Sequence, residues 1–161
     1  MSESSDGIVH SEVMELRATP AQVRKFILTP ERILDYYPQA VGGGVLEPGK
    51  AIYCQGESGV SMLELIEAEC TADCVVILVT TAFALEPPFT RERIESHMSF
   101  TMVEDWALAK SQTGTTLTKT WRNVIAKGDP PFDLEDAVRQ GAIHESASLI
   151  KGWNQAAQLA D

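Results

Sequence analysis

The chain has 161 residues and a net charge of −10, from 13 basic and 23 acidic side chains, so binding to nucleic acid phosphates or anionic lipid surfaces is disfavoured and an uncharged or cationic ligand fits better. Its composition, 44% hydrophobic and 22% charged, is ordinary for a globular protein. No stretch approaches the roughly 20 apolar residues of a membrane span, so we expect one domain, residues 8–161, without integral membrane association.

Residues 1–7 are polar and acidic, unlike the basic and apolar segments of a signal peptide. We therefore expect a disordered or loosely held N-terminus and a cytoplasmic location. The three cysteines, Cys54, Cys70 and Cys74, are odd in number and include no C-x-x-C pair, which favours buried thiols over a disulfide framework or a structural zinc site. A redox or metal role for Cys70 and Cys74, facing each other across a short turn, is the less favoured alternative. We predict neither a metal nor a cofactor.

Residues 8–18 are rich in alternating and β-branched side chains, which predicts a first strand. A Thr-Pro step then occurs twice, at residues 19–20 and 29–30, where threonine suits the N-cap and proline the first helical position. Gln22 completes a capping box for the first of these helices, and Pro38 ends the second, which includes Tyr36 and Tyr37. Two short helices therefore interrupt a strand-rich chain.

Short β-rich runs separated by turns occupy residues 45–84 and predict an antiparallel meander. The predicted strands of this region are residues 45–47, 51–55, 60–69 and 74–84. The three glycines just before it, residues 42–44, form a bend and not a phosphate loop, because no helix start, lysine or Ser/Thr follows at the required spacing.

Beyond the proline pair at residues 87–88, apolar and polar side chains alternate over residues 93–108 and predict one long strand. One face of this strand should be buried and the other wet. The residues placed on the buried face are Ile94, Ser96, Met98, Phe100, Met102, Trp106 and Leu108.

A turn leads into a last predicted strand, residues 115–126. Here Lys119 and Asn123 share a face with Leu117, Trp121 and Ile125. If this face is buried, both polar side chains point inward, where an unpaired amine or amide is costly. The alternative is that strand twist or a bulge turns them outward.

Residues 133–160 contain no proline and predict one long terminal helix with Asp133 as its N-cap. Its apolar arc consists of Leu134, Val138, Ala142, Leu149, Trp153, Ala156 and Ala160. Glu145 lies within this arc, and small residues, Gly141, Ser148 and Gly152, thin the same face. Such a face could line a cavity. The alternative for Glu145 is that it reaches the edge of the face or pairs with an arginine.

This order of elements resembles the START-like, birch-pollen-allergen-related superfamily with the helix-grip fold, and within it the bacterial polyketide cyclase/dehydrase and lipid-transport proteins. The residues that carry the resemblance are Thr19-Pro20-Ala21-Gln22-Val23, Thr29-Pro30-Glu31-Arg32, Tyr36-Tyr37-Pro38 and Gly114-Thr115. Tyr37 is a departure, because a tryptophan often precedes the proline at this point. The resemblance implies an α+β fold with a curved seven-stranded antiparallel sheet around the long helix, and a cavity between them for a hydrophobic small molecule.

The sequence is compatible with such a cavity, although large apolar side chains could instead fill a solid core. The candidate ligand-binding residues are Tyr36, Tyr37, Met98, Phe100, Met102, Trp106, Lys119, Trp121, Asn123, Glu145, Leu149 and Trp153. We expect a lipid-, sterol- or polyketide-like ligand, held at its polar end by Lys119, Asn123 and Glu145.

Two other functions remain open at this point. An enzyme of the cyclase, aromatase or dehydrase type would use Glu145 as a general base, with Lys119, Asn123 or the two tyrosines as hydrogen-bond donors. A protein-binding module like the chaperone-cofactor members of the superfamily would instead use an exposed sheet face or helix flank, with Ile143 and Ile150 as candidates. The ligand, its turnover and the oligomeric state, including a homodimer, are not fixed by the sequence.

Overall fold

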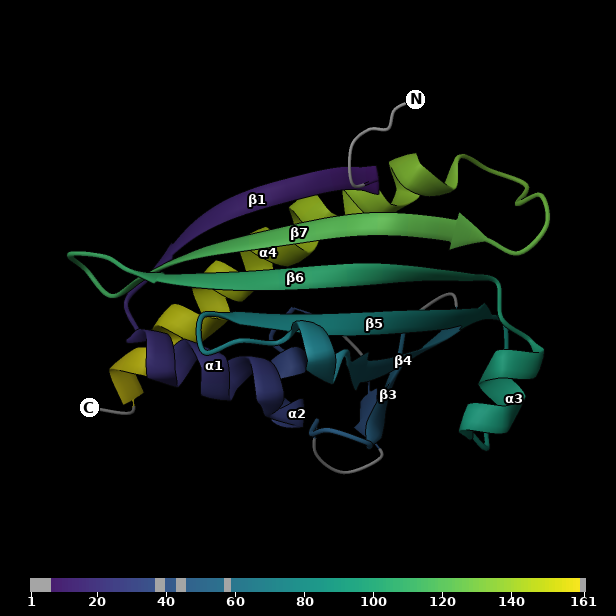
Figure 1. The fold of residues 1–161 in the computed structure, drawn as a ribbon, viewed down its shortest axis with the longest axis horizontal. Coiled ribbons are helices and arrows are strands. Elements are labelled where there is room, and N and C mark those ends of the chain that lie inside the picture. Colours follow the sequence, from purple (N-terminus) through teal and green to yellow (C-terminus); the bar gives the residue numbers. More distant parts are fainter. Residues whose placement is uncertain (1–6, 37–39, 43–45, 57–58, 160–161) are drawn as a thin grey trace.

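The computed structural model describes residues 7–36, 40–42, 46–56 and 59–159, and it shows an antiparallel sheet with one long helix across one face (Figure 1). The strands are β1 (Ile8–Leu16), β2 (Ala40–Gly42), β3 (Ala51–Gln55), β4 (Gly59–Leu65), β5 (Cys74–Phe83), β6 (Phe100–Lys110) and β7 (Thr115–Ala126). They follow the order β1-β7-β6-β5-β4-β3-β2, and each neighbouring pair is antiparallel. The α+β class predicted from the sequence is therefore confirmed.

Six of the seven predicted strands are present, and the predicted strand at residues 45–47 is wrong. Residues 46 and 47 carry no strand, residue 45 lies outside the described part of the chain, and the three-residue β2 pairs at the sheet edge instead. The Lys50 N–H donates to the Glu47 carbonyl at 3.0 Å, which closes a turn around Pro48 and Gly49. Glu47, the last residue of the predicted strand, therefore opens a turn.

Two helices follow β1, as predicted: α1 (Pro20–Leu28) and α2 (Pro30–Ile33). The Thr19 side chain accepts from the Gln22 N–H at 3.2 Å, and the Gln22 side chain accepts from the Thr19 N–H at 2.9 Å, so the predicted capping box is confirmed. The second helix is shorter than predicted: it ends at Ile33, and Tyr36 lies in the turn that follows. Tyr37 and Pro38 lie outside the described residues.

The region predicted as the first half of a long strand is a helix instead, α3 (Arg91–Ser96). The Thr90 side chain caps it by accepting from the Arg93 N–H at 3.2 Å. Ile94 is buried against apolar residues of β4 and β5 in a small cluster separate from the main core. A helix this short buries only one side chain. Its sequence therefore shows no helical spacing of apolar residues that would distinguish it from a strand.

The long terminal helix is α4 (Leu134–Leu159), and it crosses behind β1, β7 and β6 in Figure 1. Asp133 caps it as predicted, because its carboxylate accepts from the Asp136 N–H at 3.1 Å. In the second half of the helix, Leu149 and Trp153 are buried in the main core. The Trp153 ring stacks on Trp106 of β6 with ring centroids 5.9 Å apart. This half of α4 is therefore fixed to the sheet by solid packing.

Two glycines of α4 should respond in opposite ways to replacement by alanine. A Cβ at Gly141 would meet nothing within 4 Å, whereas one at Gly152 would lie 2.8 Å from Asp35 Cβ. Gly141→Ala should therefore stabilise the protein by about 0.5 to 1 kcal/mol through helix propensity. Gly152→Ala should destabilise it by about 1 to 2 kcal/mol, because the loop after α2 must move away. Denaturant unfolding measures both, and equal shifts for the two variants would contradict the close contact at Gly152.

Candidate functional site

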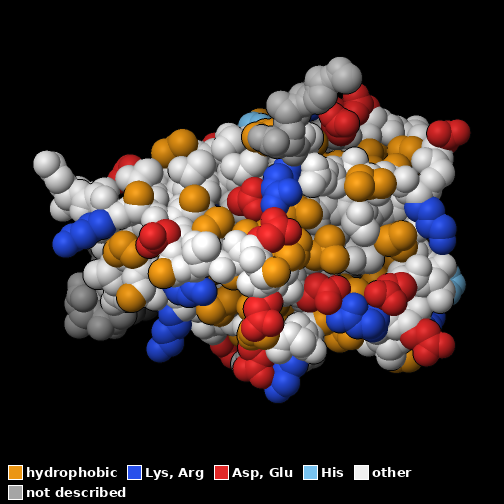
Figure 2. All heavy atoms as spheres, viewed as in Figure 1, with side chains coloured by type: hydrophobic (Ala, Val, Ile, Leu, Met, Phe, Trp, Pro, Cys, Tyr) orange, Lys and Arg blue, Asp and Glu red, His pale blue; other side chains and the backbone are white. Residues whose placement is uncertain are grey.

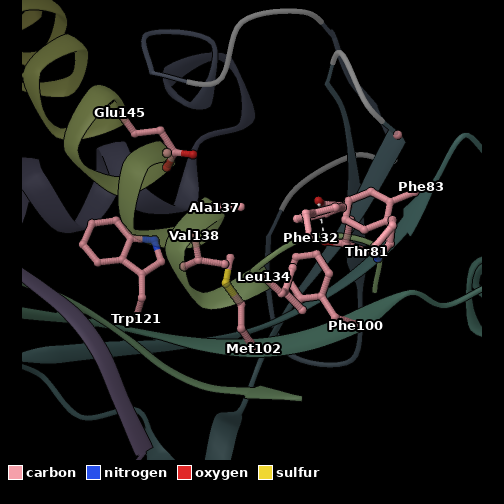
Figure 3. A pocket seen from close by; sticks show the side chains of 14 residues that line it. Thr81, Phe83, Phe100, Met102, Trp121, Phe132, Leu134, Ala137, Val138 and Glu145 are labelled. Atoms are coloured by element: carbon pink, nitrogen blue, oxygen red, sulfur yellow. Dashed lines mark hydrogen bonds between the residues drawn. The ribbon is translucent and has the colours of Figure 1, made fainter. Parts of the chain in front are cut away.

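A cavity of about 560 Å³ lies between the first half of α4 and the sheet. The residues that line it are Gly59, Ser61, Thr81, Phe83, Phe100, Met102, Trp121, Pro131, Phe132, Leu134, Ala137, Val138, Gly141 and Glu145. Figure 3 shows Phe83, Phe100 and Phe132 together at one end, with Glu145 and Trp121 at the other. Phe132 is 45% exposed, so the aromatic end lies at the surface and the Glu145 end lies inside.

The cavity exists because the side chains that α4 turns toward the sheet are smaller in its first half than in its second. Its first half presents Leu134, Ala137, Val138, Gly141 and Glu145 to the cavity, at the helical spacing that places them on one face. Apart from Leu134, these are small or medium apolar residues and one glutamate, whereas the second half fills the equivalent space with bulky core residues. The sequence predicted small residues along the whole apolar face of this helix. In the structure, only the N-terminal half of that face lines a cavity.

Three charged side chains meet at the inner end of the cavity. Lys119 Nζ of β7 lies 3.5 Å from Glu104 Oε2 of β6 and 3.7 Å from Glu145 Oε1 of α4. The Lys119 side chain is 1% exposed and the Glu145 side chain 23% exposed. We call these three residues the buried charge cluster.

Aromatic rings enclose the ammonium of Lys119. Its Nζ lies 3.9 Å from the ring centroid of Trp106, 4.6 Å from that of Trp121 and 5.0 Å from that of Tyr36. Such contacts stabilise a cation that has left water. The Trp106 indole also donates to Glu104 Oε1 at 3.3 Å, so Glu104 has two partners. Lys119 Nζ makes no hydrogen bond to a described residue, and its ion pairs are longer than a charged hydrogen bond.

Burial raises the pKa of Glu145 to about 7, with the nearby Lys119 opposing this shift and Glu104 adding to it. Burial likewise raises the pKa of the Cys54 thiol to about 12 and that of Tyr36 well above its usual value, with Glu104 contributing to both. Cys54 and Tyr36 are therefore neutral at physiological pH. Glu145, with its raised pKa, therefore changes charge near physiological pH.

Ionisation of Glu145 should reduce stability as the pH rises from its ordinary pKa of 4.5 to about 7 in the folded protein. The folded protein binds this proton more tightly than the unfolded chain, so stability falls with rising pH in this window. Glu145→Gln should therefore be more stable than the wild type at pH 8, by about 1 to 3 kcal/mol. Below pH 4.5 the difference should vanish. Denaturant unfolding of both proteins at pH 4, 6 and 8 tests this, and a difference independent of pH would contradict it.

A second, smaller cavity of about 40 Å³ adjoins the first. Its lining includes Tyr36, Cys54 and Glu104, and it shares Ser61, Met102 and Glu145 with the large cavity. This volume accommodates a water molecule and not an organic ligand. Glu145 thus stands between the large cavity and a small one that Glu104 and Tyr36 also line.

Comparisons with known proteins support the fold and go no further. No family model and no curated protein matches the chain. An uncharacterized protein from Rhizobium leguminosarum superposes with a TM-score of 0.69 at 12% identity, over 91% of this chain and 93% of that chain. The Aha1 dimer structure from Colwellia psychrerythraea gives 0.58 at 12% identity, over 89% and 94%. The fold is helix-grip-like.

A protein from the dynemicin biosynthetic locus also shares this helix-grip-like arrangement, with a TM-score of 0.56 at 14% identity. The match covers 88% of this chain but 45% of that chain, which is the longer of the two. At such identities the similarity shows the fold alone. No described helix is long and apolar enough to cross a membrane.

Most of the predicted site residues lie around the cavity or the charge cluster of this helix-grip-like fold. Phe100, Met102, Trp121 and Glu145 line the large cavity, and Tyr36 lines the small one. Lys119 lies behind Glu145 and lines neither cavity. The remaining candidates with core positions are Trp106, Leu149 and Trp153. These three support the site and do not line it.

Two of the candidate site residues, Asn123 and Met98, do not line the cavity, and a third lies outside the described part of the chain. Asn123 is exposed and does not point into the cavity. The pairing of β7 with β6 shifts register near it, and Asn123 itself has a φ of +56°, so a bulge turns the strand over at this point. Ile125, beyond the bulge, is 64% exposed for the same reason. Met98 lies in the connection between α3 and β6 and lines neither cavity. Tyr37 lies outside the described residues.

Sequence reasoning missed Glu104, although the sequence contains the signal for it. Period-two alternation from Met102 to Trp106 places Glu104 on the same inner face, where it is buried. It also missed Ser61 and Thr81, whose hydroxyls line the cavity and lie 2.9 Å apart.

The cysteines provide no second site. Cys54, Cys70 and Cys74 are all free thiols. Cys70 Sγ accepts from the Val76 N–H at 3.3 Å, which gives it a local structural role. Among the described residues no three His, Cys, Asp or Glu side chains are grouped to hold a metal ion.

Proposed function

We propose that this protein is a START-like helix-grip domain, comprising residues 8–161, that binds one hydrophobic small molecule in the cavity between the sheet and α4. The observation that supports this most is the cavity itself, which has the volume of a typical small-molecule site. Its walls are mainly apolar and aromatic, with Glu145 at one end and the hydroxyl of Thr81 beside Phe83 at the other (Figure 3). A ligand would place its apolar body against Phe100 and Met102 and its polar end at Glu145.

The direct test is calorimetric titration of the purified protein with decan-1-ol, a neutral amphipathic probe. We expect saturable binding of one molecule per chain and a rise in melting temperature that follows mass action. Decan-1-ol that gives neither saturable heat nor stabilisation, or that binds in many copies, would count against the cavity as a binding site.

An enzyme using the same cavity is the second candidate, supported by the pKa of about 7 of Glu145. A carboxyl group with such a pKa, facing an apolar space, suits a general acid or base of the cyclase or dehydrase type. Turnover that disappears in Glu145→Gln while binding persists would favour this candidate over binding alone.

The protein-binding alternative has less support. Ile150 packs against the main core, and Ile143 is half exposed by itself on α4. Figure 2 shows acidic and basic side chains interspersed with the apolar ones over the sheet face that lies opposite α4. Ion pairs among the described residues include Arg122 with Asp105 at 2.6 Å and Arg91 with Glu64 at 2.8 Å. This surface is compatible with a homodimer. The proposal also keeps the cytoplasmic location expected from the sequence.

A further inference from the structure

We infer that the ligand of this cavity carries a cationic amine at its polar end, held by the carboxylate of Glu145. This inference rests on the proposed function and names the ligand class. The first observation is which charge faces the cavity. Glu145 lines it, whereas Lys119 is 1% exposed and lies behind Glu145 and the aromatic rings. A ligand entering from the open end therefore meets a carboxylate and not an ammonium.

The second observation is the charge balance. The buried charge cluster contains two carboxylates and one ammonium, so it has a net charge of −1 when Glu145 is ionised. Glu104 has Lys119 and the Trp106 indole as partners, whereas the only ion-pair partner of Glu145 among the described residues is Lys119, at 3.7 Å. A ligand ammonium at Glu145 brings the cluster to zero net charge and adds a charged hydrogen bond to this carboxylate.

The third observation is the aromatic wall beside this carboxylate. Trp121 lines the same inner end of the cavity as Glu145 (Figure 3). This ring already faces one cation, since Lys119 Nζ lies 4.6 Å from its centroid. An indole beside a carboxylate suits an ammonium group, because the ring attracts cations and excludes water. The net charge of −10 for the whole chain further favours the approach of a cation.

The same geometry disfavours fatty acids and other anionic ligands. A ligand carboxylate at the inner end would face Glu145 directly, and like charges at this distance repel strongly in an apolar space. Lys119 cannot relieve this repulsion, because it is already held between Glu104 and Glu145. Only protonation of Glu145 or of the ligand would permit entry.

Amine binding should therefore depend on pH. The titratable groups that face Glu145 are Lys119 on β7, Glu104 on β6, Cys54 on β3 and Tyr36 after α2. The raised pKa values of Cys54 and Tyr36 keep both neutral between pH 6 and pH 8. A proton and a ligand ammonium compete for Glu145, so amine affinity should rise about tenfold from pH 6 to pH 8.

The test compares decylamine, decan-1-ol and decanoic acid by calorimetric titration below their micelle concentrations. At pH 8 we expect decylamine to bind the wild type at least about tenfold more tightly than decanoate, with decan-1-ol between them. In Glu145→Gln the amine preference should disappear while decan-1-ol still binds. The matched control is Glu135→Gln, which removes the same charge from an exposed position of α4 and should retain the preference.

The outcomes separate the inference from the proposed function. Decan-1-ol binding with equal or tighter binding of decanoate would overturn the inference and leave the cavity proposal standing. An amine preference that survives in Glu145→Gln, or an amine affinity in the wild type that does not rise between pH 6 and pH 8, would overturn it as well. Failure of all three probes to bind would overturn both.

Discussion

Replacing Lys119 with methionine is expected to lower the free energy of unfolding by about 3 to 5 kcal/mol at pH 8. Lys119 is the cation that lies within ion-pair distance of both Glu104 and Glu145, and it is almost completely buried. Methionine has a similar length but no charge, so the two carboxylates would be left close together without their cation. Buried like charges without compensation are among the largest single sources of destabilisation.

Denaturant unfolding measures this effect, and two further variants define its origin. Lys110→Met makes the same chemical change at an exposed position of β6 and should alter stability by less than about 0.5 kcal/mol. Lys119→Met combined with Glu104→Gln removes one of the two carboxylates and should recover part of the loss. A loss of less than about 1 kcal/mol in Lys119→Met would show that the cluster is not held by this charge.

Replacing Gly141 with phenylalanine is expected to weaken decan-1-ol binding by at least about tenfold. Gly141 lines the cavity on α4, and a Cβ there meets nothing within 4 Å. The new ring should therefore extend into the empty space without displacing the backbone, and it should occupy much of the volume that the ligand needs. The fold should tolerate the change, because phenylalanine also has a higher helix propensity than glycine.

The matched control places the same ring on the other side of the same helix. Ala147 is exposed on α4 and lines neither cavity, so Ala147→Phe should bind decan-1-ol like the wild type. Circular dichroism should report the same helical content for both variants. Wild-type affinity in a folded Gly141→Phe protein would mean that the probe binds elsewhere.

The parts of the fold that were predictable from sequence are those specified by local chemistry. The capping box of Thr19 and Gln22 and the cap at Asp133 were recognisable because they use side chains next to the backbone that they satisfy. The strand at residues 51–55 was predicted with its observed bounds. The segment 93–99 was assigned wrongly, because a six-residue helix with one buried residue, Ile94, has no distinctive period.

The site was predictable only as far as alternation holds along each element. Strand alternation predicted that Lys119 points inward, and helical spacing placed Glu145 on the apolar arc. Two local patterns therefore predicted that these side chains lie close together, as the structure shows. Asn123 was misplaced, because a bulge reverses the alternation and nothing local in the sequence marks it. Whether the space beside Gly141 is filled or empty depends on how far α4 lies from the sheet, which no local pattern specifies.

The most direct test of ligand binding in this cavity is methyl NMR of protein with labelled methionines, titrated with decan-1-ol. Met102 lines the cavity, whereas Met14 and Met62 are buried elsewhere and line neither cavity. We expect a saturable shift of the Met102 methyl resonance, with those of Met14 and Met62 nearly unchanged. A Met102 resonance that stays in place at saturating probe, or shifts of equal size at all three methionines, would contradict a ligand site between α4 and the sheet.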